Sequence, residues 1–211
     1  MTTADLVPRR AALVRRSTQL NVATLAYNSL EGVVALVAGA LAGSIALTGF
    51  GLDSVIEVVA SLTALWRLRA DLDADRRERV ERVSLRVIGA LFLALAAYVA
   101  IDALWALYRH EAPTESILGI LLAALSVVVM PLLARAKRRL AFQLESGALA
   151  AESEQTSLCA YLSAILLGGL VLNATVGWWF ADPIAGLAMV PIIVREGING
   201  VRGRSACGDC C

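Results

Sequence analysis

Six long apolar segments, separated by short polar connections, dominate the pattern of hydrophobic and polar positions along this chain. A helix that crosses a bilayer needs about 20 mostly apolar residues. The segments that meet or approach this length are 17–40, 44–66, 87–107, 117–133, 142–172 and 183–200. The pattern therefore predicts an all-α polytopic membrane protein with six transmembrane helices.

Composition and the distribution of cysteine agree with a membrane protein. Of the 211 residues, 58% are hydrophobic and only 18% are charged, and the mean hydropathy is +0.70. These values lie outside the range of ordinary soluble domains. Three of the four cysteines fall within the last five residues, which is unlike the spaced framework of a secreted disulfide protein. We expect a multi-pass protein of a cell membrane, a bacterial plasma membrane, with its tails in a reducing compartment.

The basic residues predict an orientation. Lysine and arginine gather in the cytoplasmic connections of membrane proteins. With both termini cytoplasmic, 18 of the 19 basic residues fall on the inner side, and Arg109 alone falls outside. The predicted organisation is a cytoplasmic arm (1–16), a six-helix transmembrane domain (17–200) and a short cytoplasmic tail (201–211). This count places Lys137, within the basic run 135–139, in a cytoplasmic connection.

Three of the predicted helices carry a polar stripe on one face. In the second segment Asp53 and Glu57 lie one helical turn apart, within an otherwise apolar stretch. The stripe of the first segment contains Asn21, Thr24, Asn28 and Glu31, and that of the fifth contains Glu145, Glu152, Thr156, Cys159 and Ser163. Glu154 points to another side of the fifth helix, where we expect it to pair with a different group.

The acids of these stripes require an explanation. A charged side chain near the bilayer centre costs about 2.5–3.5 kcal/mol even on lenient insertion scales. Asp53, Glu57 and Glu152 fall near the middle of the predicted spans, and no basic residue is expected at that depth. A bound cation, protons or both are therefore expected there, and Thr156 and Cys159 are possible further ligands for a divalent metal. Four other stripe residues have two equally good interpretations, interhelical hydrogen bonding or lining of an ion pathway. They are Asn21, Thr24, Asn28 and Ser163.

Three short runs in the second segment form a recognisable pattern: Gly43-Ser44-Ile45-Ala46-Leu47, Leu52-Asp53-Ser54-Val55-Ile56-Glu57 and Ala60-Ser61-Leu62-Thr63. They resemble the second transmembrane helix of the cation diffusion facilitator family, six-span exporters that exchange divalent metal ions for protons. The resemblance implies that Asp53 and Glu57 supply one ligand pair of a midplane site. It also implies a homodimer.

The fifth segment departs from the family pattern, which expects a second pair of ligands spaced four residues apart. Glu152 fits the first position, whereas Thr156 stands where the second carboxylate is expected, and no histidine occurs in the segment. The family usually continues into a cytoplasmic domain, whereas this sequence ends with the motif CxxCC. Its thiolates Cys207, Cys210 and Cys211 could capture a soft or borderline metal, although three sulfurs do not complete a tetrahedral zinc site. The alternative is an unstructured end whose thiols are incidental or redox-active.

Two further local features make predictions about the helices. The run 39–43, which contains Gly39 and Gly43, leaves almost no loop between the first two segments and predicts a tight hairpin with close backbone approach. Asp182 before Pro183 predicts the start of the last helix, with Asp182 as its N-cap.

The leading hypothesis is a secondary transporter that exports a divalent transition-metal cation from the cytoplasm in exchange for protons. Asp53, Glu57 and Glu152 would hold the ion, with Thr156 and Cys159 as helpers and Asn28 and Glu31 along the pathway. The alternatives are a metal-binding membrane protein that does not transport and a proton-coupled carrier of an organic cation. The sequence contains no phosphate-binding glycine loop, nucleophile elbow or HExxH motif, so we expect neither an enzyme, a cofactor nor a nucleic-acid partner.

Overall fold

Six helices make up the part of the chain that the computed structural model describes, which is residues 3–69, 74–110, 113–144 and 147–203. They are α1 (Thr3–Ala42), α2 (Ile45–Arg69), α3 (Ala74–Arg109), α4 (Ile117–Leu144), α5 (Gly147–Val176) and α6 (Ala181–Val201). Each contains a stretch long and apolar enough to cross a membrane. The prediction of an all-α polytopic membrane protein with six spans is confirmed.

The boundary between the fourth and fifth spans differs from the prediction. α4 continues through Pro131 and the basic run 135–139 to Leu144, and α5 begins only at Gly147. The helix can continue because Arg135, Arg138 and Arg139 lie on its exposed side, whereas Lys137 points into the bundle. Residues 135–139 are therefore part of a helix, and the prediction that they form a connection was wrong.

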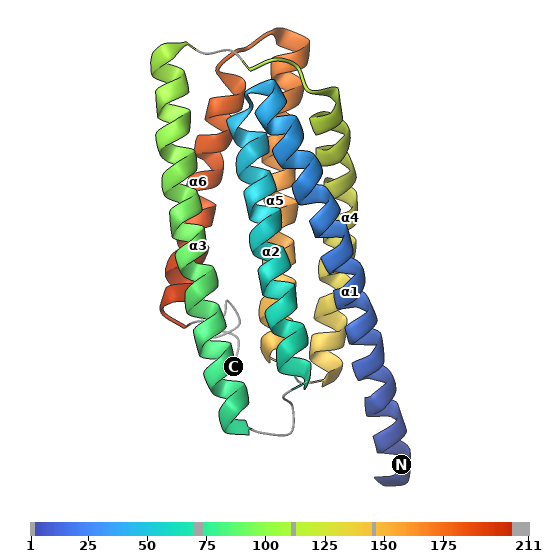
Figure 1. The fold of residues 1–211 in the computed structure, drawn as a ribbon. Coiled ribbons are helices and arrows are strands. Elements are labelled where there is room, and N and C mark those ends of the chain that lie inside the picture. Colours follow the sequence, from blue (N-terminus) through green and yellow to red (C-terminus); the bar gives the residue numbers. More distant parts are fainter. Residues whose placement is uncertain (1–2, 70–73, 111–112, 145–146, 204–211) are drawn as a thin grey trace.

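The six helices are arranged around α2 and α5, which lie in the middle of the bundle (Figure 1). The pairs α1 with α2, α3 with α6, and α4 with α5 pack most extensively, and α2 also contacts α3, α5 and α6. This central position buries much of the surface of α2. It explains how a helix with two acidic side chains is enclosed by neighbours.

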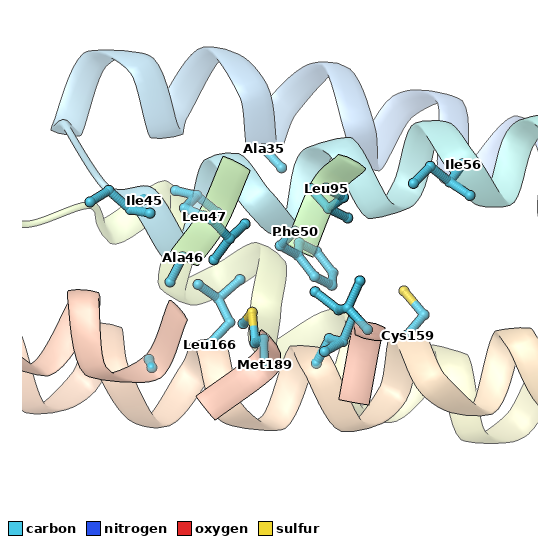
Figure 2. Close-up of a cluster of buried hydrophobic side chains, with 14 of the residues drawn as sticks. Ala35, Ile45, Ala46, Leu47, Phe50, Ile56, Leu95, Cys159, Leu166 and Met189 are labelled. Carbon is cyan, nitrogen blue, oxygen red and sulfur yellow. The ribbon is translucent and has the colours of Figure 1, made fainter. Parts of the chain in front are cut away.

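The outer surface of the bundle is apolar, and its interior is divided into two halves. Large hydrophobic side chains such as Leu41, which is 82% exposed, point outward, as expected where lipid is the solvent. Toward the turn between α1 and α2, the interior is filled by apolar side chains, including Leu47, Phe50, Leu166 and Met189 (Figure 2). Most of the buried polar side chains lie toward the other end, among buried apolar ones such as Leu140 and Leu149.

The turn between α1 and α2 is as tight as predicted. Gly43 adopts a positive φ of 65°, a conformation that glycine adopts without strain. Gly39 allows the two helices to approach each other, because a Cβ atom there would lie 2.6 Å from Thr48 Oγ1. Of the two glycines, Gly43 therefore forms the turn and Gly39 the close contact.

Asp182 stabilises a different helix from the one predicted. α6 begins at Ala181 with Phe180 at its N-cap position, so the prediction that Asp182 caps α6 was wrong. Its carboxylate instead accepts hydrogen bonds from Ser44 Oγ and from the backbone N–H of Ile45, at 2.9 Å. These groups lie at the start of α2, where unpaired N–H groups and the helix dipole favour a negative charge. Asp182 thus fixes α6 to the N-terminus of α2.

α3 and α6 approach each other at a glycine contact. A Cβ atom on Gly89 would lie 2.4 Å from the backbone nitrogen of Val201 and 2.7 Å from the carbonyl oxygen of Gly197. Small residues at such a crossing let helix backbones pack closely in a membrane. A side chain at Gly89 would force the two helices apart.

We predict that Gly89→Ala lowers the stability of the detergent-solubilised protein by about 1–3 kcal/mol, the range typical of overpacked sites. Thermal unfolding of purified protein measures the effect. The matched control is Gly168→Ala, because a Cβ atom there meets nothing within 4 Å. Equal melting temperatures for the two variants would contradict the proposed role of the close contact.

Candidate cation site

The acidic pair of α2 lies inside the bundle. Asp53 and Glu57 are 4% and 2% exposed, and they occupy the same face of the helix, one turn apart. Phe50, one turn before Asp53, belongs to the apolar half of the interior. The pair therefore lies where the apolar half ends and the polar half begins.

α5 brings three of the predicted site residues to this pair. Glu152, Thr156 and Cys159 are all buried, and the Thr156 hydroxyl donates a hydrogen bond of 2.8 Å to Glu57 Oε1. Cys159, a buried free cysteine, follows Thr156 by three residues on the same face of α5. The five predicted ligands thus come from two adjacent helices and form one cluster.

A basic residue joins this cluster, contrary to expectation. Lys137 of α4 is 1% exposed, and its Nζ lies 3.0 Å from Glu152 Oε1 and 3.0 Å from Thr156 Oγ1. The prediction that no basic group reaches the acids was wrong, because α4 continues past the point where its apolar run stops. One signal was present in the sequence: Lys137 is the only lysine, and the other 18 basic side chains are arginines.

The depth of Glu152 also differs from the prediction. It is the sixth residue of α5 rather than a residue near the middle of the span, since the helix begins at Gly147. Its Oε1 atom accepts from Lys137 and, at 3.4 Å, from Ser61 Oγ of α2. Asp53 and Glu57 lie deeper in the bundle, toward the apolar half.

The polar stripe of α1 faces the same interior. Asn21, Thr24, Asn28 and Glu31 are all buried, and Ser54 Oγ of α2 donates to Glu31 Oε2 at 3.1 Å. The amide oxygen and nitrogen of Asn21 and of Asn28 lack a hydrogen-bond partner, as does Glu31 Oε1. Buried polar atoms are normally paired with protein or water, so this stripe offers coordination positions that the protein itself does not fill.

Two stripe residues instead fit the alternative of structural hydrogen bonding. Thr24 Oγ1 donates to the carbonyl oxygen of Leu20 in its own helix. Ser163 Oγ donates to the carbonyl oxygen of Cys159 and shares a hydrogen bond of 3.0 Å with Ser126 Oγ, which links α5 to α4. Their hydroxyl groups are thus already used within the bundle.

The acids are close to one another without forming a preassembled metal site. Among the residues that the structure describes, no three His, Cys, Asp or Glu side chains are grouped so that they could hold a metal ion. One oxygen of Glu57 and one of Glu152 have no hydrogen-bond partner. Thr156 and Lys137 fill the space between these two carboxylates. Coordination by several acids would therefore require side chains to move.

The remaining predicted residues lie apart from the cluster. Glu154 pairs with Arg138 at 2.7 Å on the exposed side of α4 and α5, in agreement with the expectation that it has a separate partner. Glu145 and the tail cysteines Cys207, Cys210 and Cys211 lie outside the described residues. Their predicted roles are untested.

Comparison with known families identifies the membrane bundle. Residues 22–202 match the family model of the cation efflux transmembrane domain. The match covers α1 from residue 22 onward and the whole of α2 to α6, and it includes Asp53, Glu57, Lys137, Glu152, Thr156 and Cys159. No match was found among curated proteins.

We predict that Thr156→Val lowers stability by about 1–3 kcal/mol, because it leaves a buried carboxylate oxygen of Glu57 and the Lys137 ammonium each without one partner. Thr156→Ser should preserve both contacts. Thr175→Val is the control, since that hydroxyl is exposed and bonds only within its own helix. Thermal unfolding of the four proteins distinguishes them, and equal losses for Thr156→Ser and Thr156→Val would contradict the prediction.

Proposed function

The chain belongs to the cation efflux family, and from this premise we propose that it exports a divalent transition-metal cation from the cytoplasm in exchange for protons. The observation that carries the proposal is the burial of three acids, Asp53 and Glu57 on α2 and Glu152 on α5, with one oxygen of Glu57 and one of Glu152 left without a hydrogen-bond partner. Carboxylate, hydroxyl and thiol groups suit divalent metals from hard to borderline. Thr156 and Cys159 complete the proposed ligand set.

We propose that the end of the bundle where α1 begins faces the cytoplasm. The support comes from the arginines, of which only Arg109 falls on the opposite side in this orientation. The burial of Lys137 removes one residue from the basic residues counted on the cytoplasmic side, but the excess of basic residues on that side remains. We also propose a homodimer, as the family resemblance implies.

The two halves of the interior support a route for the ion. From the proposed cytoplasmic end, the buried amides of Asn21 and Asn28 and the carboxylate of Glu31 lead along α1 toward the acidic pair. Beyond the pair, Leu47, Phe50, Leu166 and Met189 close the interior (Figure 2). Export would require this apolar layer to open, in the manner of alternating access around a fixed site.

A cavity lies on the far side of the apolar layer. It has a volume of about 570 Å³, and its lining includes Ser44, Tyr98, Asp102 and Asp182. We propose that it receives the ion on release. Its carboxylates suit a cation, although Asp182 is already hydrogen-bonded to the start of α2.

Proton exchange follows from the crowding of acids in this interior. Several carboxylates enclosed at low dielectric cannot all stay ionised without a cation, since like charges disfavour the charged form of one another. When the metal leaves, protons would take its place. Their loss on the cytoplasmic side would prepare the cluster for the next ion.

One observation favours a second candidate function. The contacts of Lys137 place a cation of the protein itself against Glu152 and Thr156. If this contact were permanent, the chain would bind metal without moving it, as a membrane metal-binding protein. Stoichiometric binding without flux would favour this alternative.

We predict that Asp53→Asn and Glu57→Gln each reduce Zn²⁺ flux into proteoliposomes by at least about tenfold. Loss of a partner that merely orients a metal ligand costs about 10–100-fold in affinity or activity, and loss of a ligand should cost no less. The matched control is Glu154→Gln, which removes a carboxylate that pairs with Arg138 outside the cluster. Unchanged flux in either site variant would refute that ligand assignment.

We predict that Zn²⁺ flux depends on protons moving in the opposite direction. Acidifying the side that receives the metal should accelerate uptake, because protons replace the ion at the carboxylates. A protonophore should abolish this acceleration. A fluorescent pH indicator on that side should report alkalinisation during uptake, and uptake with no such change would contradict exchange.

A further inference from the structure

We infer that the Lys137 ammonium is the resting occupant of the cation site, and that a metal ion binds by displacing it. This inference rests on the proposed function, since it assigns a competing group to the same site. It concerns a residue that the match to the family does not single out. The proposed displacement changes the position of the Lys137 side chain.

The contacts of Lys137 place its charge at the proposed ligands. Its Nζ donates to Glu152 Oε1 and to Thr156 Oγ1, at 3.0 Å in each case, and Thr156 in turn donates to Glu57 Oε1. The ammonium thus engages two proposed ligands directly and a third through one hydroxyl group. A metal at this position would need the same oxygen lone pairs.

The remaining polar atoms indicate that the site is only partly filled by the ammonium. Glu152 Oε2 and Glu57 Oε2 are buried and have no hydrogen-bond partner. A single ammonium offers one positive charge and three hydrogen-bond donors. The oxygens of two carboxylates can accept more hydrogen bonds than these three. A divalent ion supplies more charge and accepts more oxygen ligands, so it can replace the lysine at a site where a monovalent ion would gain little.

The chemistry of lysine suits this role. Its charge is compact, and its four-carbon stem is flexible, whereas the rigid, planar arginine fork binds a carboxylate through two parallel hydrogen bonds. The chain uses arginine at all other basic positions and lysine only here. Lys137 can therefore neutralise Glu152 between transport cycles and withdraw without rebuilding the helix.

The first test measures Zn²⁺ binding to the full chain in detergent at constant pH. Lys137→Met removes the charge and keeps a long apolar side chain, whereas Lys137→Arg keeps the charge. If the ammonium leaves the site free for about a tenth of the time, its removal should raise the apparent affinity about tenfold. Lys137→Arg should leave the affinity at or below that of the unmodified chain. An affinity for Lys137→Met no higher than that of the unmodified chain would overturn the inference.

Arg138→Met is the matched control. It removes a positive charge from the adjacent residue of the same helix, but one that is exposed and paired with Glu154. Its Zn²⁺ affinity should equal that of the unmodified chain. An increase in Zn²⁺ affinity equal to that of Lys137→Met would show that the loss of any nearby positive charge has the same effect, and it would overturn the inference.

The second test needs no substitution at Lys137 and therefore holds even if Lys137→Met does not fold. Because the chain has one lysine, a small amine-acylating reagent followed by mass spectrometry reports on Lys137 alone among the side-chain amines. In the absence of metal, its burial between Glu152 and Thr156 should make labelling slow. Zn²⁺ should accelerate labelling several-fold, because it drives the amine out of the site. Labelling that Zn²⁺ leaves unchanged or slows would overturn the inference.

These measurements separate the inference from the proposed function. In one outcome, Asp53→Asn abolishes Zn²⁺ binding and flux, but Lys137→Met leaves the Zn²⁺ affinity unchanged. This outcome would support the proposed transport function and exclude displacement of Lys137. If Zn²⁺ displaces Lys137 but no Zn²⁺ flux is found, the inference would stand, and the chain would be a metal-binding protein that does not transport. If neither the unmodified chain nor Lys137→Met binds Zn²⁺, both the inference and the proposed function would be overturned.

Discussion

The buried ion pair between Lys137 and Glu152 is the interaction on which the polar half of this bundle depends. Removing one partner of a buried pair typically costs about 3–5 kcal/mol, because the other charge is left uncompensated. Here the pair joins α4 to α5, and the Thr156 hydroxyl extends the contact to Glu57 of α2. Three helices are therefore held in register by one chain of polar contacts. The same chain of contacts keeps acidic side chains close together in an interior that would otherwise exclude them.

The division of the interior into a polar and an apolar half follows from this arrangement. α2 lies at the centre of the bundle and contributes to both halves, with Leu47 and Phe50 on one side of Asp53 and with Glu57 and Ser61 on the other. Apolar packing holds the half near the α1–α2 turn, where Asp182 also fixes α6 to the start of α2. In the polar half, hydrogen bonds hold the helices together but leave several carboxylate and amide atoms without partners. A structure that is complete in one half and open to ligands in the other suits a protein that must bind an ion and release it.

Much of this organisation could be predicted from residue patterns. The six spans, the inward-facing stripes of α1 and α5, and the pairing of Glu154 with a separate group follow from helical periodicity and local hydropathy, which are properties of consecutive residues. The tight turn at Gly43 follows from the conformational freedom of glycine. The role of Asp182 could not be predicted in this way, because its partners Ser44 and Ile45 lie far away in the sequence.

The sequence by itself thus determined the membrane location, the number of helices and the presence of acids on inward-facing stripes, because each is encoded locally. Only the tertiary structure decided what compensates Glu152. The basic run 135–139 is typical of a connection, and although Lys137 is the one lysine among arginines, that difference does not say which of these side chains is buried. Its burial depends on α4 continuing past its apolar run and on the face that α5 turns toward it. Whether a charge lies in water or against a carboxylate is determined by packing between helices, and that packing cannot be derived from the residues of one helix alone.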